Sequence, residues 1–303
     1  MRVTDSFRFQ TYTATLSTLE SQMDTLTNQV ASGKKVLVPS DDPVSYTQNM
    51  QITAEQSQNT QYASNLNSLQ ANGAYYQTSL NSMGNILTAA QQLAVQMSSS
   101  TVNASSRTAA VNQVDGYLQQ LVALGNTKVG NTYIFGGEKA NAAAYTLNSA
   151  TNSVTFNGTN NVAKVAVNSS TTIDAGISGN TVFTGTVNGQ SVDIFATLQQ
   201  FGNDLANNDT AALQTDLTNI GNCVDLTSSN LAYVGTYTQN ISSLLSTNTT
   251  TGTTLTQTSD NLVDVDTAQA YSDYTTLSTA YQAALYVMSK AEGLSILNYL
   301  PAG

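Results

Sequence analysis

The feature that most constrains this 303-residue chain is an apolar repeat in steps of four and three over one long segment. Eleven successive a and d positions in that segment carry no charged or amide side chain: Tyr62, Leu66, Leu69, Gly73, Tyr76, Leu80, Met83, Leu87, Ala90, Ala94 and Met97. A repeat of 3.5 residues sustained this far is typical of a helix packed along a left-handed coiled-coil seam. At about 1.5 Å per residue, the segment predicts a helix of roughly 54 Å.

The same spacing recurs near both ends of the chain, which predicts two terminal helices with apolar stripes. Gly33 follows the first of these helices and suits the left-handed residue just past a helix end. A further set of apolar positions with the same spacing runs from Leu213 to Leu245, and two Thr among them weaken it. We expect the terminal helices to meet through these residues: Leu16, Leu19, Met23, Leu26, Val30, Tyr274, Leu277, Tyr281, Leu285, Met288, Leu294, Leu297 and Leu300.

The joint after the first helix has a specific sequence, in which two prolines bracket a short acidic turn: Pro39, Ser40, Asp41, Asp42 and Pro43. Proline has no N–H to donate, so it fits the first helical position, where that group has no partner in the helix. Asp42 then stands at the cap position. All three prolines of the chain lie outside the long periodic segments, as uninterrupted helices require.

Between about residues 131 and 195 the period changes to alternating and β-branched runs. We expect strands over 133–135, 154–156, 162–167, 181–183 and 190–194, with hairpin turns at Asn157-Gly158 and Asn188-Gly189. The predicted fold class is mainly α with an inserted small β domain, on a long antiparallel coiled-coil rod made from the N- and C-terminal segments. The expected domains are paired terminal helices (1–45 and 260–303), a long-helix bundle (46–130 and 200–259) and the β insert (131–199).

Composition excludes much chemistry. The chain has no His and one Cys, which removes His-dependent triads and most zinc sites. Only 9% of residues are charged, and a net charge of -10 argues against nucleic-acid binding. No stretch is long and apolar enough to span a membrane, and the first residues lack the apolar run of a secretory signal. We therefore expect no catalytic, cofactor-binding or metal-binding residues, and no cofactor.

Three local features have weaker functional interpretations. Gly136-Gly137-Glu138-Lys139 lacks the spacing of a phosphate-binding loop, which favours a plain turn. Cys223 adjoins a seam position and is expected to be a buried or half-buried small residue. An acidic cluster near the C-terminus is interpreted as a solvated helix start that suits the basic residues of the other arm (Arg2, Arg8, Lys34 and Lys35), with a cation site as the alternative: Asp260, Asp264, Asp266 and Asp273.

Three motifs together resemble the flagellin family, most closely its members at the junction between hook and filament. They are Ala31-Ser-Gly-Lys-Lys-Val-Leu-Val-Pro-Ser-Asp-Asp-Pro43, Tyr133-Ile-Phe-Gly-Gly137, and the C-terminal Asp264-Val-Asp-Thr-Ala268 with Leu294-Ser-Ile-Leu-Asn-Tyr-Leu300. The resemblance covers about the first 60 and the last 45 residues. The first helix departs from it, because flagellins often carry more Arg there.

The resemblance implies a non-enzymatic structural subunit that assembles with itself in a homo-oligomeric ring, between hook-associated protein 1 and flagellin. It further implies a cytoplasmic export chaperone, export by the flagellar type III route without a cleaved signal, and an extracellular place in the flagellum. Physically, we expect the terminal helices to order fully only on assembly. The alternatives are a flagellin of the filament, a secreted coiled-coil adhesin or effector, and a carboxylate-based enzyme.

Overall fold

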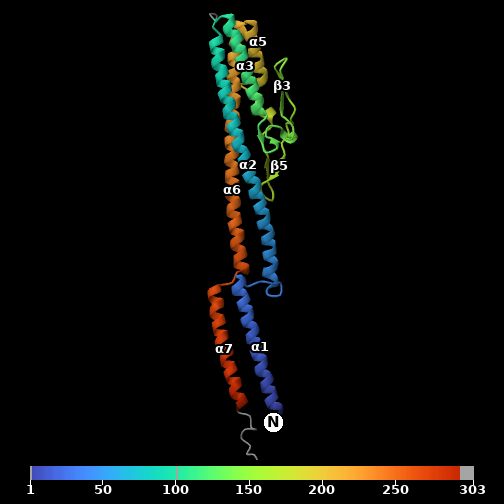
Figure 1. Ribbon diagram of the computed structural model, residues 1–303, viewed down its shortest axis with the longest axis vertical. Coiled ribbons are helices and arrows are strands. Elements are labelled where there is room, and N and C mark those ends of the chain that lie inside the picture. Colours follow the sequence, from blue (N-terminus) through green and yellow to red (C-terminus); the bar gives the residue numbers. More distant parts are fainter. Residues whose placement is uncertain (1, 100–101, 294–303) are drawn as a thin grey trace, which may run out of the picture. The chain divides into compact units, whose positions relative to one another are not determined.

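The computed structural model describes residues 2–99 and 102–293, and these are mainly helical with small β hairpins (Figure 1). The helices are α1 (Arg2–Ser32), α2 (Pro43–Met97), α3 (Ala104–Gly125), α4 (Gly179–Phe183), α5 (Ile194–Asn207), α6 (Thr210–Val263) and α7 (Thr267–Gly293), with a 3-10 helix at Gly137–Lys139. The predicted fold class is confirmed. The chain divides into a terminal unit, Met1–Gln58 with Gly252–Gly303, and a central unit, Asn59–Thr251.

In the terminal unit, α1 and α7 lie side by side and run antiparallel (Figure 1). Gly33 ends α1 in the left-handed conformation, with φ of 73°. The connection after α1 then pairs with the connection after α6 through an antiparallel bridge between Lys34 and Asp264. Beside this bridge, Val36, Val263 and Ala270 are buried. The connection after α1 and the connection after α6, which are far apart in sequence, are thus joined beside the helix ends.

In the central unit, α2 packs against α6 along the predicted seam. Ten of the eleven seam positions from residue 62 to residue 97 are buried, and Tyr62 is half-buried. On α6, every seventh residue from Leu213 to Ile241 is buried: Leu213, Ile220, Thr227, Val234 and Ile241. Contacts of Asn59 with Asn248 and of Met83 with Thr227 show that the two helices run antiparallel. The heptad interpretation is confirmed.

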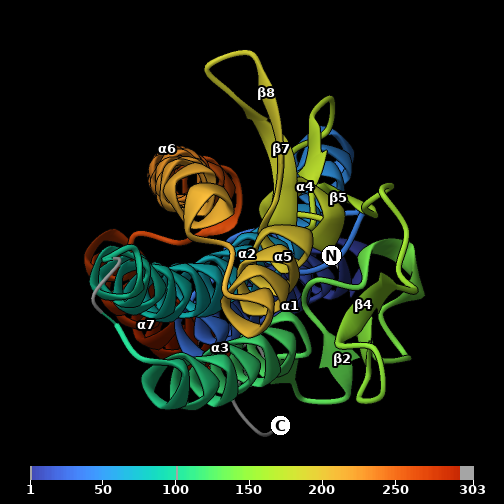
Figure 2. The same cartoon turned by 90° about the horizontal axis from the view of Figure 1, so that it is seen from above.

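The shorter helices α3 and α5 pack on each other beside this pair (Figure 2). Gly202 of α5 lies against Val114 of α3, where a Cβ would stand 3.5 Å from a Val114 methyl. A cluster of rings continues the core toward the β hairpins: Tyr76, Phe135, Tyr145, Phe156, Phe183 and Phe195. The central unit therefore contains the main hydrophobic core of the described residues.

The β region consists of four separate two-stranded antiparallel hairpins in the described residues. Their strands are β1 (Lys128–Val129) with β2 (Thr132–Tyr133), β3 (Tyr145–Asn148) with β4 (Ser153–Phe156), β5 (Lys164–Ala166) with β6 (Thr172–Asp174), and β7 (Thr184–Val187) with β8 (Gln190–Asp193). Asn188 and Gly189 form the β7–β8 turn with φ of 50° and 80°, as predicted. Figure 2 shows this hairpin projecting from the core.

Three sequence interpretations in this region are wrong. The strand expected over 133–135 ends at Tyr133, since β2 covers Thr132–Tyr133 and residues 134–135 form a turn. Residues 181–183 belong to helix α4, because the Ser178 hydroxyl caps its first turn by accepting from the Asn180 N–H (3.3 Å), and Val182 and Phe183 are both buried. Asn157-Gly158 is not the hairpin turn of β3 and β4. That turn lies at residues 149–152, where Asn152 takes a positive φ of 52° and the Asn148 side chain accepts from the Ala150 N–H (3.0 Å).

The described helices include none that is both long and apolar enough to cross a membrane.

Candidate functional site

The predicted contact residues of the terminal helices occupy one stripe on each helix, and the stripes are only partly covered. Eight of them are half-buried: Leu16, Leu19, Met23, Leu26, Tyr274, Leu277, Tyr281 and Met288. Val30 and Leu285 remain 38% and 42% exposed. Leu294, Leu297 and Leu300 lie outside the described residues. A two-helix pair has no third element to close its seam, so apolar surface remains open to solvent.

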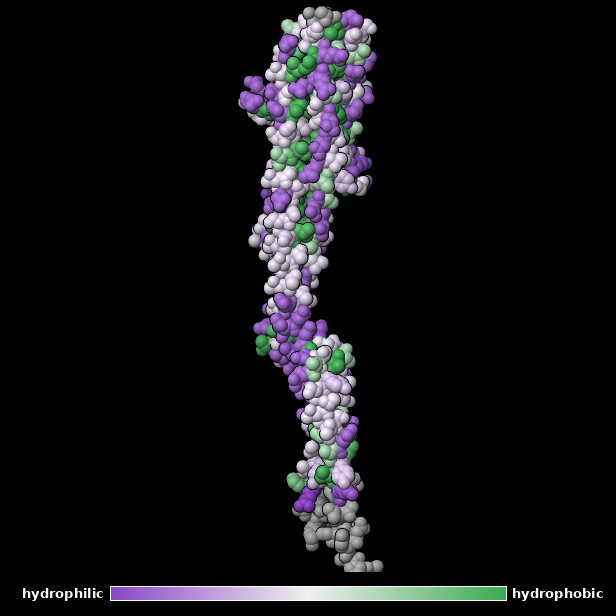
Figure 3. Space-filling model, turned by 90° about the vertical axis from the view of Figure 1, so that its left-hand side faces the viewer, coloured by the Kyte–Doolittle hydropathy of each residue, from purple (hydrophilic) through white to green (hydrophobic). Residues whose placement is uncertain are grey.

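The apolar repeat did not predict a further set of apolar side chains on the same helices. They are more exposed than the stripe: Phe7 (69%), Phe9 (48%) and Tyr12 (36%) on α1, with Tyr271 (65%), Tyr286 (65%) and Val287 (51%) on α7. Figure 3 shows apolar patches among pale surface of intermediate hydropathy in this unit. A search for large apolar residues between the stripe positions would have found them, because a solvated helix face normally carries charges there.

The Pro-bracketed joint has the predicted cap. Asp42 Oδ1 accepts from the backbone N–H groups of Val44 (3.0 Å) and Ser45 (3.1 Å), and Oδ2 accepts from the Ser45 hydroxyl (2.6 Å). These bonds, with the Ser45 hydroxyl bond the largest contribution, lower the pKa of Asp42. Pro43 opens α2, while Pro39 and Ser40 lie exposed in the turn before it.

Asp41 folds the same turn back on itself. Its Oδ2 accepts from the backbone N–H groups of Leu37 (2.9 Å) and Val38 (3.0 Å), whose side chains point to solvent with exposures of 41% and 48%. Such turns in which an Asp side chain bonds nearby backbone groups fix the local conformation. The joint therefore presents apolar side chains from a rigid turn.

Backbone hydrogen bonds join this turn to the connection between α6 and α7. The Lys35 N–H donates to the Val263 carbonyl (2.7 Å), and the Val265 N–H donates to the Gly33 carbonyl (3.0 Å). The Lys35 ammonium donates to the Asn261 carbonyl (3.1 Å), so the basic and acidic segments meet partly through backbone groups. The arm that carries α1 and the arm that carries α7 are thereby fixed to each other.

The acidic cluster divides between two helices, which corrects part of the sequence interpretation. Asp266 caps α7, since its Oδ1 accepts from the N–H groups of Ala268 (3.0 Å) and Gln269 (3.1 Å). Asp260, in contrast, lies in the last turn of α6. The cause is the break in the helix at residues 264–266. In the described residues no group of three or more acidic, Cys or His side chains could hold a metal ion.

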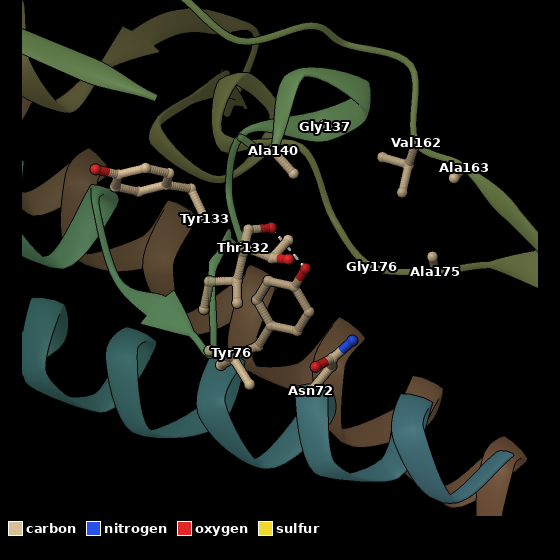
Figure 4. A pocket seen from close by; sticks show the side chains of 12 residues that line it. Asn72, Tyr76, Thr132, Tyr133, Gly137, Ala140, Val162, Ala163, Ala175 and Gly176 are labelled. Atoms are coloured by element: carbon tan, nitrogen blue, oxygen red, sulfur yellow. Dashed lines mark hydrogen bonds between the residues drawn. The ribbon is translucent and has the colours of Figure 1, made fainter. Parts of the chain in front are cut away.

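Packing and local hydrogen bonds account for Cys223 and for the hollow beside Tyr76. Cys223 is fully buried, and desolvation raises the pKa of its thiol to about 11. A hollow between α2 and the hairpins is lined by the polar side chains of Asn72, Thr132 and Tyr133 (Figure 4). The Tyr76 hydroxyl also lies there. It donates to the Ile134 carbonyl (2.7 Å) and accepts from the Ile177 N–H (3.2 Å), so it is committed to holding the β region on α2.

Comparison with known proteins agrees with this architecture. Residues 8–140 match the bacterial flagellin N-terminal helical region, and residues 204–300 match the bacterial flagellin C-terminal helical region. Flagellar hook-associated protein 3 of Escherichia coli strain K12 is 27% identical, covering 88% of this chain and 90% of that protein. Its namesake from Salmonella typhimurium strain LT2 is 26% identical, covering 98% of both.

A solved structure supports the fold alone. Flagellar hook-associated protein 3 from Legionella pneumophila superposes with a TM-score of 0.63 at 14% identity, covering 70% of this chain and 98% of that one. Terminal helices that match both flagellin regions, with a β region inserted between them, define a structural subunit of the bacterial flagellum. The chain belongs to the flagellin-like family, as a member of the hook-associated protein 3 group.

Proposed function

We propose that the chain acts at the junction between the flagellar hook and the filament by stacking copies of itself through the α1–α7 pair. It is a structural subunit of the flagellum, and its likeness to hook-associated protein 3 supports this junction as its place. We assign the assembly role to the paired helices of residues 1–45 and 260–303. The contacting surface comprises the half-buried stripes together with the exposed apolar residues beside them.

The observation that carries the proposal is the difference between the two units. In the central unit the seam positions of α2 are almost all buried, whereas the stripes of α1 and α7 are half-buried at best. At about 25 cal/mol per Å² of apolar area, closing these stripes against neighbouring copies would stabilise the assembled state. A surface with few charges also offers little repulsion between like subunits.

We propose coupled folding and assembly as the mechanism. A helix pair with an incompletely covered seam has little tertiary stabilisation, and most helical stability in proteins comes from packing. In a dilute monomer α1 and α7 would therefore open often, while in the ring they would be held by neighbours. The joint, with its bonds between Gly33, Lys35, Val263 and Val265, would keep the two helices together as one arm.

The finer assignments follow the family. We propose hook-associated protein 1 on one side of the ring and flagellin on the other, and a cytoplasmic chaperone that covers the C-terminal helix before export. We also propose export by the flagellar type III route without a cleaved signal peptide, an extracellular location, and no catalytic role. The absence of His from the chain supports the last of these.

The test is deletion of the gene combined with imaging of the labelled protein. Loss of a junction subunit should leave cells with hooks that release flagellin into the medium, whereas loss of a filament flagellin leaves none to release. Label should form one band at the outer end of the hook. Label along the whole filament would favour the flagellin alternative, and an independently active β region would favour an adhesin.

A further inference from the structure

The corner between α5 and α6 brings acidic side chains together. Helix α5 ends at Asn207, and the cap residue Asn208 takes the left-handed conformation with φ of 59°. Asp209 then caps α6, because its Oδ1 accepts from the N–H groups of Ala211 (3.1 Å) and Ala212 (3.0 Å). The chain thus passes from one helix into the next through two residues, and side chains from both helices meet beside this turn.

Two carboxyl groups are buried at this corner. Asp204 is 8% exposed and Asp216 is 2% exposed. Both Asp204 oxygens accept from the Gln200 amide at 2.9 Å. Within the part of the chain that the structure describes, Asp216 Oδ2 is buried without a hydrogen-bond donor. An ionised carboxylate in such a place is costly unless a proton or a cation compensates it.

The identity of the compensating cation follows from the chemistry of the pair. Asp204 is the side chain whose charge and hydrogen bonding act most strongly on the Asp216 carboxyl. Two ionised carboxylates only accept hydrogen bonds and repel each other, whereas one protonated and one ionised carboxyl form an O–H···O⁻ bond. No metal-binding group of three ligands occurs among the described residues. A proton satisfies the orphan oxygen without further ligands.

We infer that Asp204 and Asp216 share one proton, and that loss of this proton loosens the corner between α5 and α6. This proton-sharing pair is independent of the assembly surface proposed above. Deprotonation would place two negative charges among the apolar side chains that close this end of the core, including Leu205 and Leu213, which are 1% and 0% exposed.

The groups on the neighbouring elements do not neutralise the pair. Asp209 adds a negative charge from the loop. Helix α2 contributes no Asp, Glu, Lys or Arg between Glu55 and its end. On α3, the buried Arg107 donates from Nη2 to the Ser99 carbonyl (3.1 Å), and its Nε has no hydrogen-bond partner among the described residues. Arg107 is not among the charges that act on Asp216. Asp115 accepts from the Asn152 amide (2.7 Å). The proton therefore remains the compensating charge.

The direction of the pH effect can be worked out. Burial, then the charge of Asp204 and its hydrogen bond, and finally the charge of Asp209 raise the pKa of Asp216 from 3.8 to about 7. Because the folded pKa lies above the unfolded one, the folded corner holds its proton longer as the pH rises. Stability of the corner is therefore lost as pH rises from about 4 to about 7 and then levels off.

The experiment is hydrogen exchange of the full chain, read on peptides from α5 and the start of α6 as a function of pH. After correction for intrinsic exchange, the opening constant should rise by up to about tenfold per pH unit between about pH 5 and 7 and then flatten. Asp216→Asn should remove this rise. Asp225→Asn, at an exposed site on the same helix, should leave the profile unchanged.

A second readout protects the test against a variant that folds poorly. Infrared difference spectra of the wild type at pH 6 should contain a protonated carboxyl band, and Asp204→Asn should shift its titration to lower pH. A wild-type opening constant that does not change with pH, or an unchanged rise in a folded Asp216→Asn, would overturn the inference. Protection restored at pH 8 by millimolar Ca²⁺ through Asp216 would likewise overturn it in favour of a metal site.

Discussion

Asn59 and Asn248 hydrogen-bond to each other reciprocally across helices α2 and α6. The Asn248 amide donates to the Asn59 side-chain oxygen (2.7 Å) and backbone carbonyl (3.1 Å), while the Asn59 amide donates to the Asn248 carbonyl (3.1 Å). Asn248 is 8% exposed and continues the heptad line that includes Ile241. A buried Asn in a coiled-coil seam fixes register at a cost in stability, and this pair fixes which turn of α2 faces which turn of α6.

Asn248→Ala should lower the free energy of unfolding of the chain by about 1–3 kcal/mol, because it leaves the side-chain oxygen of the half-buried Asn59 without its donor. Urea denaturation measures this loss. Asn240→Ala, on the exposed face of the same helix, is the matched control and should change stability little. Equal effects of the two substitutions would show that the reciprocal bonds contribute nothing specific.

Asn248→Leu separates register from stability. Leu should increase burial, yet it removes the group that distinguishes one register from others. We expect a chain at least as stable as wild type that forms mixed oligomers on size-exclusion chromatography. A single monomeric species with unaltered exchange along α2 would contradict the register role.

Gly73 and Gly84 provide a matched pair on one helix. A Cβ at Gly73 would overlap the Thr238 methyl of α6, whereas a Cβ at Gly84 would stand 3.9 Å from the Thr227 methyl. Gly73→Ala should therefore destabilise by about 1–3 kcal/mol through overpacking, and Gly84→Ala should stabilise by up to about 1 kcal/mol through helix propensity. Thermal denaturation gives the sign of the change in stability for each substitution. A stabilising Gly73→Ala would contradict the close approach of α2 and α6.

Tyr145 and Tyr76 differ in what their hydroxyls do. The Tyr145 hydroxyl is buried without a hydrogen-bond partner in the described residues, while Tyr76 makes two hydrogen bonds. Tyr145→Phe keeps the ring contacts and should leave stability unchanged or raise it by about 1 kcal/mol, whereas Tyr76→Phe should lower it by about 1–3 kcal/mol. Chemical denaturation measures the change in stability for each substitution. A larger loss of stability in Tyr145→Phe than in Tyr76→Phe would contradict this assignment.

Asp42 should make the start of α2 sensitive to acid. Its pKa is lowered in the folded state, so its contribution is present above the unfolded pKa and is lost as pH falls through the folded value. Asp42→Ala should speed amide exchange over the first turn of α2 at pH 7, and Asp42→Asn, which keeps an acceptor, should do so less. Protection that is identical in both variants and wild type would refute the cap.

Much of the fold could be predicted because its signals are local and repeated. The seam from Leu66 to Met97 is a periodic pattern in one helix, and the Pro43 joint is a cap whose chemistry lies within a few residues. The helix at Thr181–Phe183 could not be predicted from its β-branched run, because burial of Val182 and Phe183 against distant rings outweighs local propensity.

The residues of the candidate site could likewise be predicted only in part from the sequence. Stripe residues such as Leu19 and Leu277 follow the repeat, whereas Phe7 and Tyr286 lie off it and their exposure depends on what packs nearby. The proton-sharing pair was missed for a third reason. Asp204 and Asp216 lie 12 residues apart on two helices, and only the corner at Asn208 and Asp209 brings their carboxyl groups together.

The central claim is that the α1–α7 pair becomes fully ordered only when copies assemble. Hydrogen exchange of the full chain, measured as a dilute monomer and again after assembly, tests it most directly. We predict that residues 6–32 and 267–290 exchange quickly in the monomer and become protected in the assembly, while the α2 seam is protected in both states. Protection of α1 and α7 in the monomer equal to that of the α2 seam would contradict the account.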